Sequence, residues 1–462
     1  MTEIYNKFRQ DSENKAFDRE HRRKLDFNIG RYDEAVKRGK QQYANLELAR
    51  QRAAAIRYRA IADLEKNLAD FESNFERNGG KVIWALDAAD ALREIETILL
   101  NHKAAKVVKS KSMVSEEISL NDHLEKTGIE VLETDLGEYI VQQAGEHPYH
   151  IVTPAMHKSK EDVAVLFNEK FGLPVKSTPE DITAYVRKKL REKFFHADVG
   201  ITGANFIIAD TGSVCVTENE GNGLLSMSFP KVHIVVTGIE KVLPSFRNLD
   251  LFWPLLATHG TGQYVTAYNS LISGPRQDGE TDGPKEMYVV LLDNGRSQLL
   301  AQKHQRRALS CIRCGACLNT CPVYKTIGGH AYGTTYSGPI GSVITPWLKG
   351  VNEFKHMSFA SSLCGSCTEV CPVKINLHEL LLYNRNDSVK LKTFTLSEAL
   401  SMFAWKTIML NRKWMDFGSP RLKNFVLNKA FSKQWGSRRK MPEVSDKNFR
   451  QLWEERNEGK TN

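Results

Sequence analysis

The segment Cys311–Pro322 reads CIRCGACLNTCP, and its four cysteines follow the spacing CxxCxxCxxxCP of bacterial-type ferredoxins. A second segment, Cys364–Pro372, reads CGSCTEVCP and repeats the end of that spacing. Thiolates at this spacing bind iron, because a loop that offers a sulfur every third residue can wrap around one face of an iron–sulfur cluster. The two segments therefore predict an α-helical, ferredoxin-type domain with two [4Fe-4S] clusters over residues 300–390.

The two segments are expected to exchange ligands, because the fourth cysteine of such a run usually binds the other cluster. The first cluster then has four thiolates, from Cys311, Cys314, Cys317 and Cys371. The second has three, from Cys321, Cys364 and Cys367. The second cluster is therefore one thiolate short.

Ser361 stands where a complete second run would have its first cysteine. A serine alkoxide is a poor iron ligand, so several alternatives stay open for the fourth position. They are water, a substrate, a side chain of a partner protein, His356 or His378. A three-iron cluster, which needs no fourth ligand, is a further alternative.

Zinc and disulfide bonds are the other roles that clustered cysteines can have. A zinc site uses four ligands in two CxxC-like pairs, which seven cysteines with two Cys-Pro endings fit poorly. Eight cysteines in 462 residues are too few for a disulfide-stabilised secreted scaffold. Iron is therefore the preferred interpretation.

The composition is that of an ordinary globular protein, with 41% hydrophobic residues and a formal net charge of +9. The basic excess suits an acidic partner, an anionic membrane surface or small anionic substrates, whereas no recognition motif favours nucleic acid. No apolar run approaches the roughly 20 residues of a membrane-spanning helix, and the polar N-terminus lacks a signal-peptide core. We therefore expect a cytoplasmic protein, whose thiols stay reduced.

Residues 79–295 alternate β-rich segments with helical ones, which predicts an α/β domain with a mostly parallel sheet. Strands are expected at Lys81–Ala85, Ala105–Lys109, Ile129–Thr134, His150–Thr153, Ala204–Ala209, Ser213–Glu218, His233–Thr237 and Glu286–Leu292. Helices are expected at Ala88–Leu100, Leu120–Lys126, Lys160–Phe171 and Pro179–Phe195.

Polar residues that follow strands are the candidate site residues, because ligands of such sheets bind beyond the carboxyl ends of the strands. Lys109 and Lys111 are the candidates for binding a carboxylate. Glu218 and Glu220 are the candidates for binding a hydroxyl group or moving a proton. The segment His259–Gln263 is expected to be a loop that forms one wall of a cleft.

Histidines and one isolated cysteine have simpler interpretations. His147, His150 and His157 could form a metal site, but their irregular spacing favours ordinary polar contacts. Cys215 alternates within a predicted strand and is expected to be a small core residue.

Helical regions flank the two domains. In residues 1–78 apolar positions recur three or four apart, which predicts long amphipathic helices with a solvated basic face. Residues 391–462 form a basic and aromatic helical region; residues 390–440 hold twelve Lys or Arg against two acidic residues. Such a region can contact an anionic membrane peripherally, dock an acidic partner subunit or close over the cluster domain.

Four motifs and the two cysteine segments give the chain a family resemblance. The motifs are KSKSMVSEE (109–117), ETDLGEYI (133–140), ADTGSVCVTENEGNG (209–223) and SGPRQDGETDGPKE (273–286). Over nearly its full length the chain resembles the lactate utilization protein B family, iron–sulfur proteins of a bacterial L-lactate oxidation system. Its α/β motifs resemble the lactate-utilization domain, which is similar in fold to ribose-phosphate isomerase.

The resemblance implies an electron-transfer subunit that works with two companion lactate-utilization subunits to oxidise L-lactate to pyruvate. It also implies cluster ligands at the seven cysteines. It does not say which subunit binds lactate, so two alternatives stay open. One is a non-catalytic, cluster-bearing scaffold, and the other is an oxidoreductase subunit for another hydroxy acid or a sugar phosphate.

Overall fold

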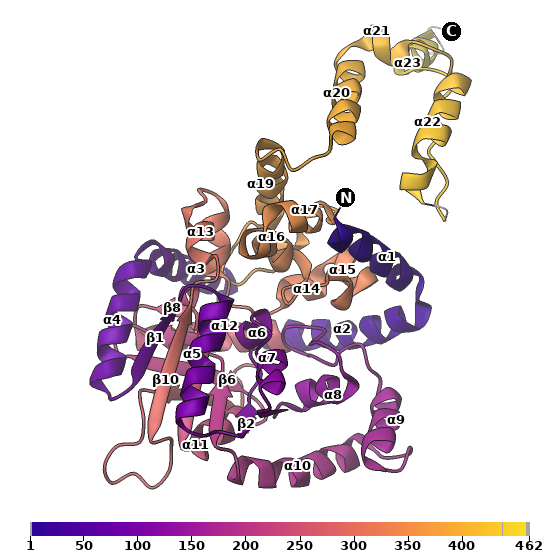
Figure 1. The fold of residues 1–462 in the computed structure, drawn as a ribbon. Coiled ribbons are helices and arrows are strands. Elements are labelled where there is room, and N and C mark those ends of the chain that lie inside the picture. The colour runs from indigo at the N-terminus through magenta and orange to yellow at the C-terminus, as the bar shows by residue number, and fades with distance from the viewer. Residues whose placement is uncertain (1, 437, 459–462) are drawn as a thin grey trace. The chain divides into compact units, whose positions relative to one another are not determined.

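A six-stranded sheet forms the centre of the α/β domain in the computed structural model, which describes residues 2–436 and 438–458 (Figure 1). The strand order is β1-β10-β7-β4-β2-β3, and every neighbouring pair is parallel. The strands are β1 (Lys81–Ala85), β2 (Lys106–Lys109), β3 (Glu130–Glu133), β4 (Val199–Thr202), β7 (Val232–Gly238) and β10 (Glu286–Leu292). The prediction of a mostly parallel sheet is confirmed.

The chain order reverses between β2 and β4. The chain passes from β2 outward to β3. Strands β4, β7 and β10 then follow one another across the sheet in the opposite direction, and β1 lies beyond β10 at the edge. Such a switch point leaves a crevice at the carboxyl ends of the two strands, because the connections leave on opposite sides. The site described below lies at this crevice.

Both faces of the sheet are covered, as the near-continuous apolar sequence of its strands requires. Val290 of β10 packs in one core with helices α5 (Ala88–Asn101) and α7 (Leu120–Lys126). Its neighbour Val289 packs in the opposite core, with helix α4 (Leu64–Arg77). The helices beyond β2 and β3 form a third core; they are α8 (Leu136–Ala144), α9 (Lys160–Phe171) and α10 (Pro179–Phe195).

A second, four-stranded sheet was not predicted. Its order is β8-β5-β6-β9, with one parallel pair and two antiparallel pairs. The strands are β5 (Phe206–Ile208), β6 (Ser213–Glu218), β8 (Val242–Leu243) and β9 (Tyr268–Ile272). Cys215 of β6 is buried in the core, as expected, and accepts a hydrogen bond from Trp253 Nε1 at 3.1 Å.

Two predicted elements are wrong. His150–Thr153 is a loop and not a strand, because His150 Nδ1 accepts hydrogen bonds from the backbone N–H groups of Val152 and Thr153 and so turns the chain. His259–Gln263 is mostly the end of helix α12 (Leu249–Thr261), which stops at Gly262 with a φ of 77°.

The N-terminal helices pack against both domains. They are α1 (Glu3–Phe17), α2 (Arg19–Gly39), α3 (Leu46–Ala62) and α4. Arg57 of α3 departs from the predicted solvated basic face, because its side chain is fully buried. Its guanidinium donates to four backbone carbonyls, those of Glu240, Val242, Leu309 and Ser310, at 2.5–3.2 Å. It thus ties a helix to the sheet and to the first cysteine segment.

The predicted cluster domain is helical, as expected, and follows α13 (Arg296–Ala301). Its helices are α14 (Ala316–Thr320), α15 (Pro322–Ile327), α16 (Gly338–Lys349), α17 (Val351–Phe359), α18 (Ser366–Glu369) and α19 (Leu377–Lys390). Leu25 of α2, Leu255 of α12 and Tyr324 of α15 belong to one hydrophobic core. The first helix also packs against the predicted cluster domain: Figure 1 shows α1 beside α15.

Residues from Lys392 onward form a separate compact unit. It contains α20 (Leu396–Leu410), α21 (Arg412–Asp416), α22 (Pro420–Trp435) and α23 (Phe449–Glu458). Neither α20 nor α21 buries a residue, and Phe403 is 70% exposed.

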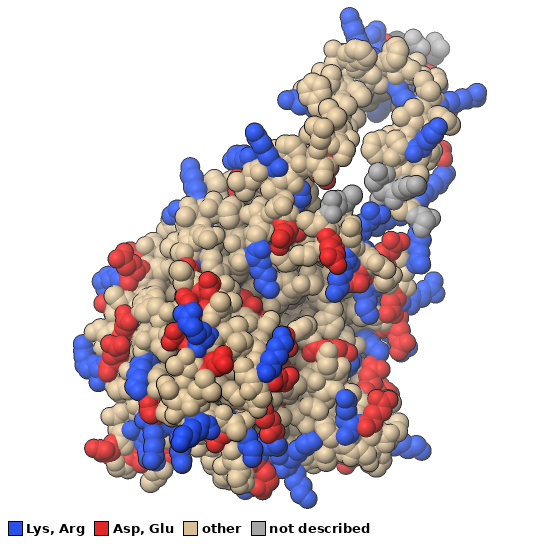
Figure 2. Space-filling view, in the orientation of Figure 1, with Lys and Arg blue, Asp and Glu red and all other residues tan. Residues whose placement is uncertain are grey.

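Among the described residues no helix combines the length and apolar character needed to cross a bilayer. On the face drawn in Figure 2, basic and acidic side chains are interspersed over the first unit.

Candidate functional site

The two cysteine loops have the same backbone conformation. Arg313 and Gly315, on either side of Cys314, have φ values of 59° and 80°. Leu363 and Gly365, on either side of Cys364, have φ values of 55° and 84°. Positive φ is uncommon for arginine and leucine, so the shared pattern marks a loop shape that both segments are built to hold.

The first residue of each loop also has the same environment. In the first loop the backbone N–H of Arg313 donates to Cys311 Sγ at 3.3 Å. In the second loop the backbone N–H of Leu363 donates to Ser361 Oγ at 3.1 Å. Ser361 Oγ therefore occupies the place in its loop that Cys311 Sγ occupies in the first.

Seven thiols form two neighbouring groups. Burial, and after it the thiols of Cys311, Cys314 and Cys371 and, last, that of Cys367 in the neighbouring group, raises the pKa of Cys317. Burial, and after it the thiols of Cys321 and Cys364, raises the pKa of Cys367 to about 12. Each group thus combines cysteines of both segments.

The donor set fits iron–sulfur clusters. Backbone N–H groups point at the sulfurs, as in the 3.3 Å hydrogen bond from Ile375 to Cys371 Sγ. Such hydrogen bonds are typical of cluster-binding loops, where they stabilise thiolates and tune the reduction potential. Cys364 is the one exposed thiol of the seven, so solvent reaches the group with three cysteines.

Cations are in excess beside Cys311. The buried Arg57, Lys241 and Arg296 and the largely buried Arg313 surround two buried carboxylates, those of Glu117 and Glu240. Arg296 bonds both carboxylates, at 2.8 Å and 2.6 Å, and Arg313 bonds Glu240 at 3.3 Å. Four cations against two anions leave two positive charges, which favour an anionic cluster and anionic ligands nearby.

A cavity of about 620 Å³ opens at the carboxyl ends of β2, β3, β4 and β7. Its lining includes residues within three positions of the ends of these strands, among them Lys111, Asp135, Gly203 and Lys241. Arg313 and Cys314 of the first cysteine loop also line it. The cavity therefore joins the switch point of the sheet to a predicted cluster ligand, within the size range of small-molecule sites.

Comparisons with known proteins agree with these observations. Residues 68–292 match the LUD domain, and residues 307–375 match the 4Fe-4S dicluster domain. The chain is 42% identical over 429 residues to lactate utilization protein B of Bacillus cereus (strain AH820), and equally to that of Bacillus thuringiensis (strain Al Hakam). Both matches cover 90% of each chain.

The chain belongs to the lactate utilization protein B family. It is thus an iron–sulfur protein with a role in lactate utilization. A solved structure of a DUF162 family protein from Deinococcus radiodurans is also similar, with 15% identity over 50% of this chain and 98% of that one. Its TM-score of 0.29 is too low to support an argument.

In this member of the family, the two candidate lysines lie in different surroundings. Lys109 is fully buried and bonds Glu133 at 2.7 Å and Glu116 at 3.3 Å; it does not line the cavity. Lys111 lines the cavity, where it bonds Asp135 at 3.4 Å and the carbonyl of Val152 at 3.1 Å.

Both candidate glutamates line the cavity but already have donors. Glu218 accepts from the backbone N–H groups of Gly223 and Leu224, each at 2.7 Å. Glu220 accepts from the backbone N–H of Leu136 at 3.1 Å. Burial raises the pKa of both carboxyl groups. They hold loops around the cavity, and their role in binding a hydroxyl group or moving a proton stays a prediction.

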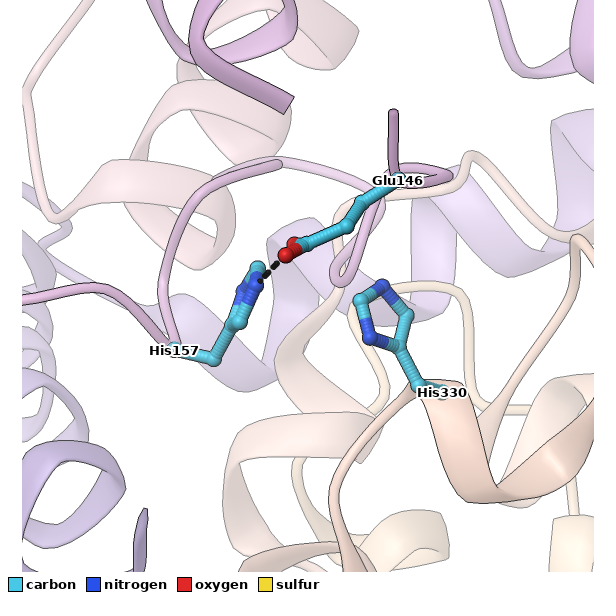
Figure 3. A group of neighbouring side chains, drawn as sticks. All are labelled: Glu146, His157 and His330. Atoms are coloured by element: carbon cyan, nitrogen blue, oxygen red, sulfur yellow. Dashed lines mark hydrogen bonds and ion pairs between the residues drawn. The ribbon is translucent and has the colours of Figure 1, made fainter. Parts of the chain in front are cut away.

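The three histidines of the sequence analysis make polar contacts, as expected. His157 Nε2 bonds Glu146 at 2.6 Å, and His330 approaches the same carboxylate from another segment (Figure 3). This trio has the donor atoms of a metal site, but Lys158 also bonds Glu146, at 2.8 Å, and its charge opposes a bound cation. We assign no metal to it.

Four cavity residues were not singled out for a substrate from the sequence: Lys241, Arg313, Asn319 and, as a ligand donor, His150. Arg313 and Asn319 lie inside the cysteine segment, where the cysteine spacing dominates the interpretation. Lys241 lies four positions beyond the predicted strand end at Thr237 and three beyond the observed end of β7 at Gly238. Its place after a strand was the available signal.

Proposed function

We propose that this protein is the electron-transfer subunit of a bacterial system that oxidises L-lactate to pyruvate. The observation that carries the proposal is the repeated loop geometry. Two cysteine segments have the same backbone shape, and together their thiols form two neighbouring groups. The family membership adds the lactate context. When bound, iron–sulfur clusters accept and release single electrons.

The ligand sets follow from the grouping of the thiols. Cys311, Cys314, Cys317 and Cys371 would hold one [4Fe-4S] cluster. Cys321, Cys364 and Cys367 would hold the other, with Ser361 at its fourth corner. Around the first set, Arg57, Lys241 and Arg313 supply positive charge that stabilises the reduced, more negative state. The chain thus favours electron entry next to the cavity.

Replacing Cys317 with alanine tests the ligand sets. The protein purified without oxygen should hold about eight iron atoms, and Cys317→Ala should lose about four of them and unfold more easily, because cluster binding is also folding energy. Iron and acid-labile sulfide are measured together with the paramagnetic resonance spectrum of the reduced protein. Cys215→Ala is the matched control, because Cys215 is a buried core thiol outside both groups.

Two outcomes would contradict the proposal. The wild-type chain could contain no iron or sulfide, or Cys317→Ala could keep the full iron content. The lactate role is tested by adding L-lactate to the loaded chain with its two companion subunits. We expect the visible absorbance of the clusters to bleach with L-lactate and not with D-lactate.

A further inference from the structure

One wall of the cavity carries hydrogen-bond donors that lack partners. Lys241, in the short 3₁₀ helix that follows β7 (Ile239–Lys241), is 6% exposed. Within the described part of the chain, its ammonium group forms no hydrogen bond or ion pair. The charge of Glu240 stabilises this ammonium group, whereas the charges of Arg313 and Arg57 oppose it, so an additional anion in the cavity would be stabilised here.

Arg313 provides the second free donor. Its Nη2 bonds Glu240, and its guanidinium lies 4.6 Å from the ring centroid of Tyr336, so the side chain is held in place. Its Nη1 is buried and, among the described residues, has no partner. Arg313 immediately precedes Cys314, which lines the same cavity.

His150 provides the third donor. Its Nδ1 accepts from the backbone N–H groups of Val152 and Thr153, at 3.1 Å and 3.2 Å, which assigns the ring proton to Nε2. Nε2 is buried and, within the described ranges, unpaired. Burial also lowers the pKa of His150 to about 3, so the neutral ring remains a donor.

Asn319 adds an acceptor to the three donors. Its side chain is 1% exposed and lines the cavity next to His150 and Tyr32, and its Oδ1 accepts no hydrogen bond of good geometry among the described residues. Two cationic donors, one neutral donor and one acceptor match a carboxylate with a neighbouring hydroxyl group. The acidic cavity residues do not compete, because Asp135 bonds Lys111 and Glu218 and Glu220 accept from backbone N–H groups.

We propose that this wall binds a small 2-hydroxy acid beside the first cysteine group. Lys241 and Arg313 hold the carboxylate, His150 Nε2–H donates to an oxygen of the acid, and Asn319 Oδ1 accepts from the hydroxyl group. This inference rests on the proposed function, since that function supplies L-lactate as the acid. A molecule of this size fills only part of the cavity, at the wall that Cys314 shares.

Calorimetric titration of the oxygen-free, cluster-loaded chain with L-lactate tests the proposal. We expect saturable binding, and at least about tenfold weaker binding of propanoate, which lacks the hydroxyl group. Lys241→Met should weaken the affinity for L-lactate by about tenfold or more, with unchanged iron content. Lys241→Arg, which keeps the charge, should retain measurable binding if the methionine variant folds poorly.

The control is Lys193→Met, which removes a cation from a surface ion pair with Glu130; neither residue lines the cavity. A loaded chain that binds no L-lactate overturns this inference and leaves the electron-transfer role standing. A chain without iron overturns the proposed function instead. Loss of binding in Lys111→Met but not in Lys241→Met would also overturn the assignment of the carboxylate to Lys241.

Discussion

Ser361 and Cys311 are equivalent residues in two loops of one shape, and they differ in whether the side chain ends in oxygen or sulfur. Each accepts a hydrogen bond from the backbone N–H two positions later. Sulfur is the better iron ligand, so the serine would leave the proposed second cluster with one weakly held or open corner. The corner also lies beside the exposed Cys364, where solvent or a partner can reach it.

Ser361→Cys should therefore complete the second ligand set. We expect a changed paramagnetic resonance spectrum of the reduced protein and slower loss of iron to a chelator. Ser361→Ala is the matched control, since it removes the oxygen without adding sulfur. Identical spectra for the wild type and the cysteine variant would show that position 361 does not face the cluster.

Lys109 and Lys241 illustrate which site residues a sequence can reveal. Lys109 ends a strand and belongs to a family motif, yet it is buried among its own carboxylates, Glu116 and Glu133. Lys241 belongs to none of the family motifs, and within the described chain its ammonium group forms no hydrogen bond or ion pair. Whether a lysine is paired depends on residues distant in sequence, so spacing alone cannot separate the two.

At the scale of elements, the sequence predicted those helices and loops whose structure depends on residues close together in the chain. The predicted bounds of α9 and α10 are those observed, and both helices begin with a capping box, at Ser159 and Thr178. The cysteine loops were likewise predictable, because their ligands are close in sequence. The second sheet and the His150 loop were missed, since short strands and side-chain bonds to the backbone leave little periodicity.

The ion network of α6 (Met113–Glu117), α13 and the first cysteine loop is a further property of elements. Burial alone would raise the pKa of Glu240, but Arg296, Arg313 and Lys241 outweigh it and lower the value to about 2. The pKa of Glu117 is lowered in the same way, mainly by Arg296. These carboxylates stabilise the fold above their ordinary pKa of 4.5, and the stabilisation is lost as the pH falls toward 2.

Arg296→Met should thus cost about 3–5 kcal/mol of unfolding free energy at neutral pH, because it leaves two buried carboxylates with too few partners. The cost should shrink as the pH falls below about 4.5 and the carboxylates of the variant take up protons. Urea unfolding across this pH range measures both effects. An exposed arginine, Arg93, provides the control as Arg93→Met. A loss that does not depend on pH would contradict the electrostatic explanation.

At the scale of the whole molecule, the chain divides after Leu391. The second unit exposes many apolar side chains, such as Phe403, Trp405 and Leu410, within a basic segment. This composition suits contact with an anionic membrane surface or an acidic companion subunit. The first unit contains all seven clustered cysteines and the cavity.

A chain truncated after Leu391 should keep its iron content and thermal midpoint, because the helices α20 and α21 bury no residues. It should lose binding to vesicles with phosphatidylglycerol that the full chain binds at low salt. Co-sedimentation at two salt concentrations measures this. Equal binding by both chains would exclude the second unit as the contact, and loss of iron would contradict its independence.

The hydrogen bonds of Arg57 limit how early helix α3 can pack during synthesis of the chain. The ribosome releases this residue early, but the carbonyls that accept from it lie 183 to 253 positions further along the chain. Helix α3 therefore cannot settle until the segment before Cys311 has emerged. In a nascent chain that stalls before this point, we expect the guanidinium of Arg57 to lack these four partners and the hydrophobic core to stay incomplete.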